Sequence, residues 1–297
     1  MGNLVCQYKQ YGLGVPIIDA RVRLPVCLRP AADGVPPEGF ERYEEVLGLL
    51  SASQADTTQL WSDLNLAGIE RAIIHAEYER TSSVQALNDA TAALVGTEPL
   101  KLRGVGTVDL THVHPRRSVR EVRRCQSLGL VGINLQPAFF DLDLDDRRLY
   151  PIYAEAESLA LVMSVHTGVH YSRSHKLGHE LPRLLDNVAV DFPDLRLVAC
   201  HAGWPWIDEM CAVVRRHPQV SVDFGGLAPK YVSAAGTGWS TLFRLMDNVL
   251  SEQVIFASDW PAFGPQAAVE QWKAAGLKQS TLDRLFSSNA ATLYNWQ

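Results

Sequence analysis

LVMSVHTG (Leu161–Gly168) and LRLVACHAG (Leu195–Gly203) are two short apolar runs whose first residues lie 34 positions apart. Both are rich in aliphatic and β-branched residues, and both end in a polar side chain close to a glycine, which is typical of a buried strand. A repeat of about 30 residues is the size of a strand–helix–strand unit. The two runs therefore indicate neighbouring parallel strands joined by a helix.

The same pattern extends outward in both directions. From the second run onward, the runs start 25 to 34 residues apart, and the spacers carry helical periodicity at 57–66, 149–159 and 206–214, with Asp56 as an expected N-cap. Eight near-continuous apolar strands that alternate with helices favour a parallel sheet that closes into a barrel. The six further runs are Val15–Arg21, Glu70–Ala76, Leu102–Asp109, Val131–Pro137, Val220–Gly226 and Val254–Pro261.

We therefore predict one domain, a (β/α)₈ TIM barrel over 15–297, preceded by an N-terminal extension at 1–14. An open doubly wound sheet is the alternative, but it predicts a glycine-rich phosphate turn after the first strand, and IIDARVRLP contains none. The connection from Val22 to Ile69 is much longer than one helix and includes a Pro- and Gly-rich part and a helical part at 40–50. We expect this long loop after the first strand to form a wall or lid of the active site.

The composition narrows the function classes. The chain has 297 residues with a net charge of −6, which argues against a general nucleic-acid binder because phosphate backbones require a basic face. It contains no signal-peptide pattern and no apolar run long enough for a membrane helix. Five scattered cysteines without a CxxC motif suit reduced thiols. These features predict a cytoplasmic protein with a small-molecule partner.

Polar side chains recur at the carboxyl ends of the predicted strands, where TIM barrels carry their active sites. One such side chain alone is most simply a structural residue, whereas several that converge on one barrel mouth indicate a pocket. Strict alternation along the first strand would place Asp19, Arg21 and Arg23 on the same face. The other candidates are Asn134 and Gln136 in strand four, His166 in strand five, His201 in strand six, Asp223 in strand seven and Asp259 in strand eight.

At these residues the chain resembles the amidohydrolase superfamily, in the amidohydrolase-related branch with aminocarboxymuconate-semialdehyde decarboxylase and pyrone dicarboxylate lactonase. The resemblance covers about Val15 to Tyr294 and lies in IIDARVR, GINLQP, DDRRLYPIYAEAESLALVMSVHTG, FPDLRLVACHAGWPW, VSVDFGGL, VIFASDWP and SSNAATLY, in the order of the family. It implies the barrel fold and an enzyme, and it is a weaker guide to the substrate because this fold hosts many reactions.

The resemblance also implies a metal pattern that this chain lacks in part. Members of the family usually carry Asp-x-His-x-His after the first strand, and here the two histidines are replaced by Arg21 and Arg23. A guanidinium offers no lone pair and cannot bind a metal at neutral pH. We therefore predict no cofactor and no metal. The less favoured possibility is a divalent ion held by the family positions that remain, His166, His201 and Asp259.

Two arginines suggest an anion clamp, because their planar forks match a carboxylate. Arg21 and Arg23 are therefore predicted to bind the substrate, with the alternative that Arg21 pairs with Asp259 or Asp19 as a structural bridge. Asp259, His201 and His166 are the predicted acid–base groups. The further predicted substrate contacts are Trp204, Trp260, His170, Tyr171 and Gln136.

Three functions remain open from the sequence. The first is a metal-independent hydrolase, similar to a lactonase or amidohydrolase, that acts on a small anionic or cyclic substrate. The second is a lyase of the same fold, either a decarboxylase or a cyclase or dehydratase. The third is a barrel that binds a small molecule without catalysis. Dimers are common in this fold family, so a homodimer is compatible with all three.

Overall fold

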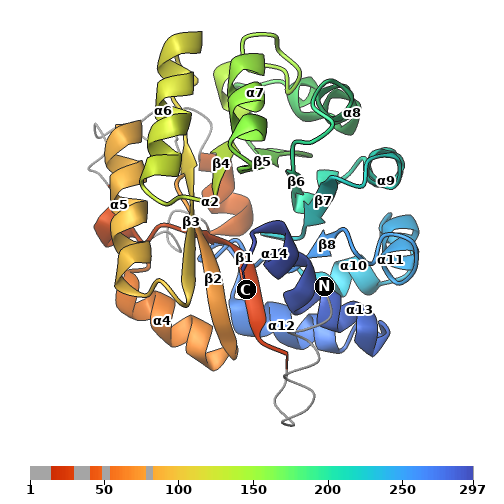
Figure 1. The fold of residues 1–297 in the computed structure, drawn as a ribbon. Helices are drawn as coiled ribbons and strands as arrows, with labels where there is room; N and C mark the ends of the chain where they lie inside the picture. The colour runs from red at the N-terminus through yellow and green to blue at the C-terminus, as the bar shows by residue number, and fades with distance from the viewer. Residues whose placement is uncertain (1–14, 30–40, 49–53, 78–82, 297) are drawn as a thin grey trace.

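The computed structural model describes residues 15–29, 41–48, 54–77 and 83–296. Eight parallel strands pair in chain order, from β1 to β8 (Figure 1). Backbone bonds from Ala20 N to Phe256 O and from Arg23 N to Trp260 O, both 2.9 Å long, join β1 to the segment that follows β8. The strands are β1 (Ile17–Arg23), β2 (Ile69–His75), β3 (Leu102–Thr107), β4 (Gly132–Leu135), β5 (Val162–His166), β6 (Leu197–Cys200), β7 (Val220–Asp223) and β8 (Val254–Ile255).

Helices follow the strands and surround the barrel, which confirms the predicted single-domain TIM barrel (Figure 1). The α-helices are α2 (Glu41–Leu47), α4 (Thr57–Leu66), α5 (Val84–Thr97), α6 (Pro115–Ser127), α7 (Tyr150–Ser158), α8 (Pro182–Asp191), α9 (Ile207–Arg216), α10 (Pro229–Ser233), α11 (Ser240–Met246), α12 (Pro265–Lys273), α13 (Gln279–Asp283) and α14 (Asn289–Leu293). The short 3₁₀-helices are η1 (Val26–Leu28), η2 (Pro137–Phe140), η3 (Leu177–Glu180) and η4 (His201–Gly203), and η5 (Arg284–Ser288) is a π-helix.

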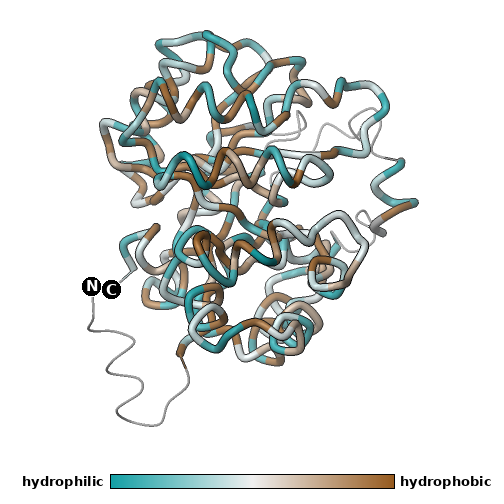
Figure 2. The backbone as a smooth tube through the Cα atoms, turned by 90° about the vertical axis from the view of Figure 1, so that its right-hand side faces the viewer, coloured by the Kyte–Doolittle hydropathy of each residue, from teal (hydrophilic) through white to brown (hydrophobic). Residues whose placement is uncertain are grey.

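Local sequence signals explain where the outer helices begin and what they bury. α4 has the predicted bounds, and the Asp56 carboxylate accepts a hydrogen bond from Gln59 N at 2.9 Å as its N-cap. Figure 2 shows that the helical turns of the outer layer alternate between hydrophobic and hydrophilic residues. One face of each such helix therefore packs on the barrel, and the other is left to solvent.

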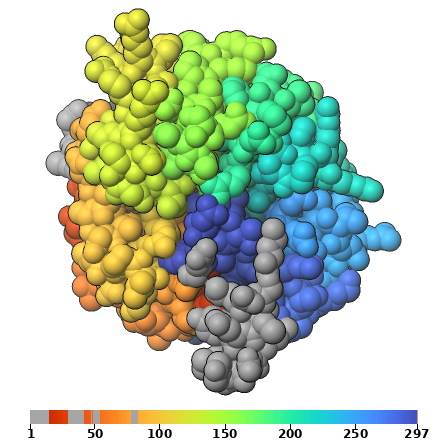
Figure 3. Space-filling view, viewed as in Figure 1, coloured from red at the N-terminus to blue at the C-terminus, as the bar shows by residue number. Residues whose placement is uncertain are grey.

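The core has two parts. The larger one lies between the strands and the surrounding helices, and the smaller one fills the barrel interior with Ile18, Ile73, Val105 and Val198 among others. The same interior cluster includes residues of the last helical segment, Ala290, Leu293, Tyr294 and Trp296. Figure 3 shows this dark blue segment in the centre of the face viewed. The chain end therefore closes the barrel at the amino ends of its strands and leaves the carboxyl ends for a site.

The first strand departs from regular alternation. The partner of Asp19 on β2 is Ala72 and that of Val22 is Ile74, so β1 carries one extra residue within this interval. The expectation that Asp19 shares a face with Arg21 and Arg23 is wrong for this reason. Asp19 instead accepts bonds from Ser258 N at 3.0 Å and Ser258 Oγ at 2.5 Å.

Three predicted placements need correction along the chain. β1 runs to Arg23 instead of ending at Arg21, because Val22 and Arg23 still pair with Ile74 and His75 of β2. His201 begins the η4 turn and is not part of β6, and Asp259 lies four residues beyond the end of β8. Of the predicted helical part at 40–50, α2 is present, and residues 40, 49 and 50 lie outside the described residues. Among the residues that the structure describes, no helix has the length and apolar character that crossing a bilayer requires.

Candidate active site

A small cavity of about 70 Å³ opens at the carboxyl ends of the strands. It takes side chains from β1, from α2 in the long first connection, from the ends of β5 and β6, and from the segments after β7 and β8. Six of the predicted site residues meet there. The lining residues are Arg23, Tyr43, His166, Val169, Tyr171, His201, Trp204, Gly225, Gly226, Leu227 and Asp259.

Arg21 lies beneath this cavity and is completely buried. Its guanidinium donates to Asp259 Oδ1 at 3.1 Å through Nε, to Glu77 Oε1 at 2.5 Å, and to Asn134 Oδ1 at 3.3 Å. Burial works against its charge, but the neighbouring Glu77 and Asp259 carboxylates outweigh burial and raise the pKa of Arg21 above its ordinary value. Arg21 is thus a permanent buried cation whose described contacts are protein groups.

Arg23 holds the same two carboxylates from the cavity side. Its Nε and Nη2 reach Asp259 Oδ1 and Oδ2 at 3.1 and 2.9 Å, a bidentate pair, and its Nη1 lies 2.9 Å from Glu77 Oε2. Burial alone would raise the pKa of Asp259, but Arg23 and Arg21 outweigh it and hold that pKa well below its usual range. Asp259 is therefore ionised at neutral pH.

The four side chains form a balanced group, with the cations Arg21 and Arg23 facing the anions Glu77 and Asp259. The structural bridge between Arg21 and Asp259, one of the two sequence interpretations, is present. Arg23 is the member of the pair that lines the cavity, with 12% of its side chain exposed. Substrate binding by either arginine stays a prediction.

His166 lies at the end of β5, and its ring is fixed by a buried carboxylate. Its Nδ1 is 2.5 Å from Glu180 Oε2, and Glu180 in η3 is completely buried. An ionised carboxylate only accepts, so Nδ1–H is the donor, and Nε2 is the nitrogen that remains for the cavity. Phe139 packs on the ring with 6.1 Å between centroids.

The ring of His201 is also held through its Nδ1, in this case by a backbone carbonyl. Its Nδ1 donates to Gly225 O at 2.6 Å, and its own N–H donates to Asp223 Oδ1 at 3.0 Å. A carbonyl cannot donate, so the neutral ring carries its lone pair on Nε2. Burial, reinforced by His166, lowers the pKa of His201 and keeps the ring neutral. The two imidazole rings lie 4.7 Å apart between centroids.

Backbone conformation marks two of these residues as unusual. His201 and Asp259 have φ angles of 60° and 59°, in the left-handed region that few residues other than glycine adopt. Such conformations cost about 1–3 kcal/mol each and gather at functional sites. Gly225, whose carbonyl accepts this bond from His201, packs closely on the site, because a Cβ there would lie 3.1 Å from both Arg21 Cδ and Asp259 Cβ.

Four of the predicted site residues do not line the cavity. Arg21 lies below it, and Trp260 is buried, with Nε1 donating to Asp63 Oδ2 at 2.8 Å. His170 is buried against Phe139, 5.5 Å between ring centroids, and Gln136 is buried before η2. Tyr171 and Trp204 do line the cavity.

Sequence reasoning missed Glu77, Glu180 and Tyr43. Glu77 follows the second strand by two residues and belongs to the same class of polar residues after strands, so that rule could have found it. Glu180 lies 14 residues beyond His166 in a stretch without periodicity, and no sequence signal marks it. Tyr43 comes from α2 and meets Tyr171 edge to face at 5.5 Å, which gives the long first connection its place in the cavity wall.

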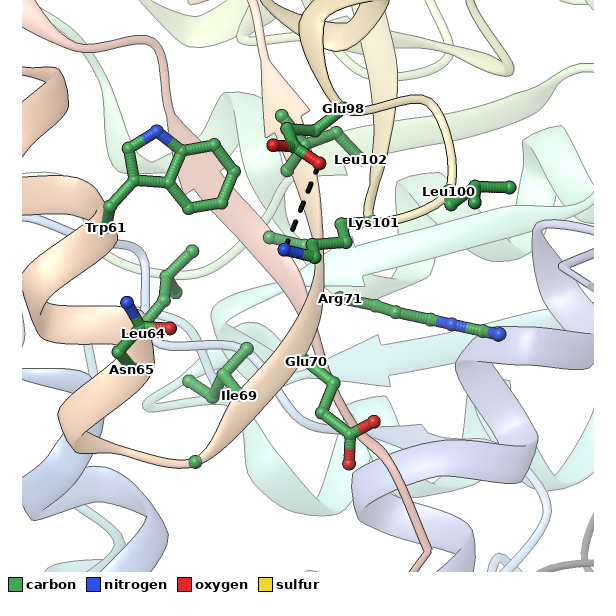
Figure 4. Close-up of a pocket in the computed structure, with 12 residues that line it drawn as sticks. Trp61, Leu64, Asn65, Ile69, Glu70, Arg71, Glu98, Leu100, Lys101 and Leu102 are labelled. Atoms are coloured by element: carbon green, nitrogen blue, oxygen red, sulfur yellow. Dashed lines mark ion pairs between the residues drawn. The ribbon is translucent and has the colours of Figure 1, made fainter.

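A larger cavity of about 640 Å³ lies at the opposite end of the barrel, near the starts of β2 and β3. Figure 4 shows Trp61, Leu64 and Leu100 around it, with one ion pair of 3.9 Å between Lys101 and Glu98. Arg71 lies at its edge and stacks on Trp296 at 5.2 Å. Among the described residues that line this cavity there is no histidine, so it has no counterpart of the imidazole pair at the carboxyl ends.

Comparisons with known proteins identify related enzymes. The gamma-resorcylate decarboxylase of Rhodococcus jostii is 24% identical over 254 residues, covering 70% of this chain and 74% of the relative. An uncharacterized TIM-barrel protein from Bordetella bronchiseptica is 24% identical, with a TM-score of 0.76 and 95% and 99% of the two chains covered. The 5-carboxyvanillate decarboxylase of Sphingomonas paucimobilis is 16% identical, with a TM-score of 0.72 and 95% and 99% of the two chains covered.

Two further solved structures share the fold and differ in chemistry. One is a probable 2-pyrone-4,6-dicarboxylic acid hydrolase from Acinetobacter baumannii, with 14% identity, a TM-score of 0.65 and 94% and 99% coverage. The other is a 5-carboxyvanillate decarboxylase from Novosphingobium aromaticivorans in complex with manganese. It has 18% identity, a TM-score of 0.68 and 95% and 96% coverage. Metal-containing enzymes therefore exist among the proteins with this fold.

The residues of this chain do not fit such a metal. Both Asp259 oxygens accept hydrogen bonds from guanidinium groups, so this carboxylate already faces two cations at the position where it would meet a metal ion. In the described part of the chain, no three His, Cys, Asp or Glu side chains are grouped as metal ligands. Each guanidinium would also repel a cation by about 4 kcal/mol per pair of unit charges at 4 Å in a partly buried site.

The family assignment rests on the whole barrel. The amidohydrolase family model matches residues 18–296, from the first strand to the segment that closes the barrel. The match includes β1 with its two arginines and the segments that carry His166, His201 and Asp259. The resemblance found in the sequence is thereby confirmed, and the chain belongs to the amidohydrolase family, whose fold serves both decarboxylases and hydrolases.

Proposed function

We propose that this chain is a metal-independent hydrolase that opens a small cyclic ester carrying a carboxylate. One observation carries the proposal. Two imidazole rings lie 4.7 Å apart at the cavity, each with Nδ1 committed to a fixed acceptor, which leaves both Nε2 atoms for proton transfer. Such a pair can activate water without a metal.

The proposed reaction starts with a water molecule that donates one hydrogen to His166 Nε2 and the other to His201 Nε2. His166 takes its proton as the water oxygen bonds to the acyl carbon of the substrate. The carbon–oxygen bond of the ring then breaks, and His166 returns the proton to the departing oxygen. One water is consumed, and the product is the open-chain hydroxy acid.

Arg23 is the residue that binds the negatively charged group of the substrate in this proposal. It is the guanidinium on the cavity wall, and Asp259 and Glu77 hold its plane in place. The same cation lies where it can offset the charge that develops on the acyl oxygen. Asp259 stays in the proposal as an ionised group. Its role as proton acceptor stays a prediction, which the Asp259→Asn variant below tests.

A decarboxylase of the same fold is the second candidate, because the Rhodococcus jostii relative has that activity in its name. In that reaction His166 would deliver a proton to the ring carbon that loses carbon dioxide. The wild-type protein is to be assayed with 2-pyrone-4,6-dicarboxylate for ring opening, and with 2,6-dihydroxybenzoate and 5-carboxyvanillate for carbon dioxide release. Ring opening alone supports the hydrolase, and carbon dioxide release alone replaces it with the lyase.

Metal independence gives a direct prediction. The purified protein is expected to contain far less than one equivalent of zinc, manganese or iron, and chelators should leave its activity unchanged. Elemental analysis by mass spectrometry, beside assays with and without chelator, measures both. Stoichiometric metal that is lost together with activity, and restored with it, would contradict the prediction.

The anion clamp predicts a separation of effects. Arg23→Ala should weaken binding of a carboxylate substrate by about 30- to 1000-fold, since a charge-assisted bidentate contact is worth about 2–4 kcal/mol. Arg23→Lys should recover part of the binding, because it keeps the charge and loses the fork. If Asp259 accepts a proton in spite of its two guanidinium partners, Asp259→Asn should lower turnover while substrate still binds. Titration calorimetry beside turnover measures each, and wild-type binding by Arg23→Ala would exclude the clamp.

A further inference from the structure

We infer that Glu180 is the positioning residue of this site, which sets the tautomer of His166 and aims its Nε2 into the cavity. The inference rests on the proposed function for its effect on turnover, but the tautomer can be measured without any substrate. The observation that carries it is the contact of 2.5 Å between Glu180 Oε2 and His166 Nδ1, in which the carboxylate is completely buried.

The carboxylate is held at both of its oxygens. Oε2 faces His166, and Oε1 accepts from Ala138 N at 3.3 Å in the turn after β4. The carbonyl oxygen of Glu180 accepts from Gly168 N at 3.2 Å, two residues beyond His166. Glu180 therefore joins the loops after β4 and β5, and the ring of His166 cannot turn without breaking its bond to Oε2 of this anchored carboxylate.

The turn that carries Glu180 is itself fixed from the outside. His179 Nδ1 lies 2.6 Å from Asp143 Oδ1, and His179 O accepts from Leu144 N at 3.0 Å. These contacts would hold η3 in place whatever side chain stood at 180. A buried carboxylate is costly unless it is paired, so its presence here needs a reason beyond the turn, and the imidazole of His166 supplies one.

The chemical consequence follows from tautomerism. A neutral imidazole carries its proton on one nitrogen, and the hydrogen bond at the other end decides which one. With Nδ1–H bound to Glu180, Nε2 keeps its lone pair for the water of the proposed reaction. When that nitrogen takes a proton, the adjacent carboxylate stabilises the charged ring, as in an acid–histidine pair of a hydrolase.

The test uses the full-length protein labelled with ¹⁵N-histidine, whose two-bond ¹H–¹⁵N spectra report which ring nitrogen carries the proton. Assignment uses His166→Gln. In the wild type, His166 is expected to be protonated at Nδ1. In Glu180→Ala, the proton should move to Nε2. Glu180→Gln, nearly the same in shape, is the second variant where the alanine protein does not fold, and it should show a mixture of the two tautomers.

Activity gives the second readout, with whichever of the probe substrates above is turned over. Glu180→Ala should lower kcat at least about 10-fold while KM changes less than about 3-fold, because binding groups are untouched. His179→Asn is the matched control: it loosens the same turn without touching His166, and it should keep both the wild-type tautomer and the wild-type kcat.

The outcomes separate the two proposals. An unprotonated Nδ1 in the wild type, or an unchanged tautomer in both Glu180 variants, overturns the role of Glu180. A fall in kcat in His179→Asn equal to that in Glu180→Ala also overturns it, since a general loosening would then explain both. A tautomer change as expected, in a protein that turns over none of the probes, supports Glu180 and counts against the proposed function.

Discussion

His166→Gln should lower kcat by about 10²–10⁴-fold, the range that a positioned general acid or base supplies. The glutamine side chain can still fill the space above Glu180 but cannot take and return a proton. Substrate binding should change little, because Arg23, Tyr171 and Trp204 still line the cavity. Turnover and KM, measured side by side with the active probe substrate, show whether the loss is confined to the chemical step.

His175→Gln is the matched control for this prediction. His175 also packs on Phe139, at 5.6 Å between centroids, but it does not line the cavity. We expect it to keep turnover close to that of the wild type. A His166→Gln protein with turnover within about 3-fold of the wild type would remove His166 from the reaction and shift the proton transfer to His201 or Asp259.

Arg21→Met should lower the free energy of unfolding by about 3–5 kcal/mol, because it leaves two buried carboxylates with one cation between them. Arg21 contacts Glu77 and Asp259, whose side chains are only 6% and 3% exposed, so water cannot fully replace the lost cation at either carboxylate. Urea unfolding followed by fluorescence measures the change.

The double variant Arg21→Met with Glu77→Gln restores the charge balance, leaving Arg23 opposite Asp259. It should be more stable than Arg21→Met alone, which separates uncompensated charge from lost packing. Arg123→Met, which breaks an exposed pair with Glu155, is the surface comparison and should have a much smaller effect. If Arg21→Met lowers the free energy of unfolding no more than Arg123→Met does, the balanced group of two arginines and two carboxylates does not stabilise the fold.

Hydrophobic patterning was enough to predict the barrel, because its parallel strands are buried on both faces and their apolar runs recur at the spacing of strand–helix units. It could not predict the bulge in β1, since alternation assumes one residue per position and nothing in IIDARVR marks the extra one. Asp19 was therefore placed on the wrong face. The end of β6 was misplaced for a related reason, because the chain leaves the sheet at His201, whose backbone is left-handed, and apolar content does not signal this. The end of β8 was misplaced because the apolar run continues through Phe256 and Ala257 after the strand has ended.

The strand-end rule brought Arg23, His166, His201 and Asp259 to one cavity, since all parallel strands of a barrel end on the same side. The rule says nothing of residues that arrive on long loops, so Glu180 and Tyr43 were missed. Nor does it distinguish a side chain that enters the cavity from one that ends beneath it. Arg21 and Trp260 have polar ends that find protein partners before they reach the cavity, and only packing decides that.

The two arginines beside Asp259 are cations that the chain itself supplies to the site. A metal ion has to bind from solution, competes with other ions and can be removed by a chelator. A guanidinium is present as soon as the chain folds. Unlike a metal ion, a guanidinium has no vacant orbital that can accept an electron pair from a ligand. A guanidinium neutralises and orients, but it cannot pull electron density from a bound oxygen as a Lewis acid does. If the proposed metal-independent function is correct, the chain has given up Lewis-acid activation and needs no metal supply.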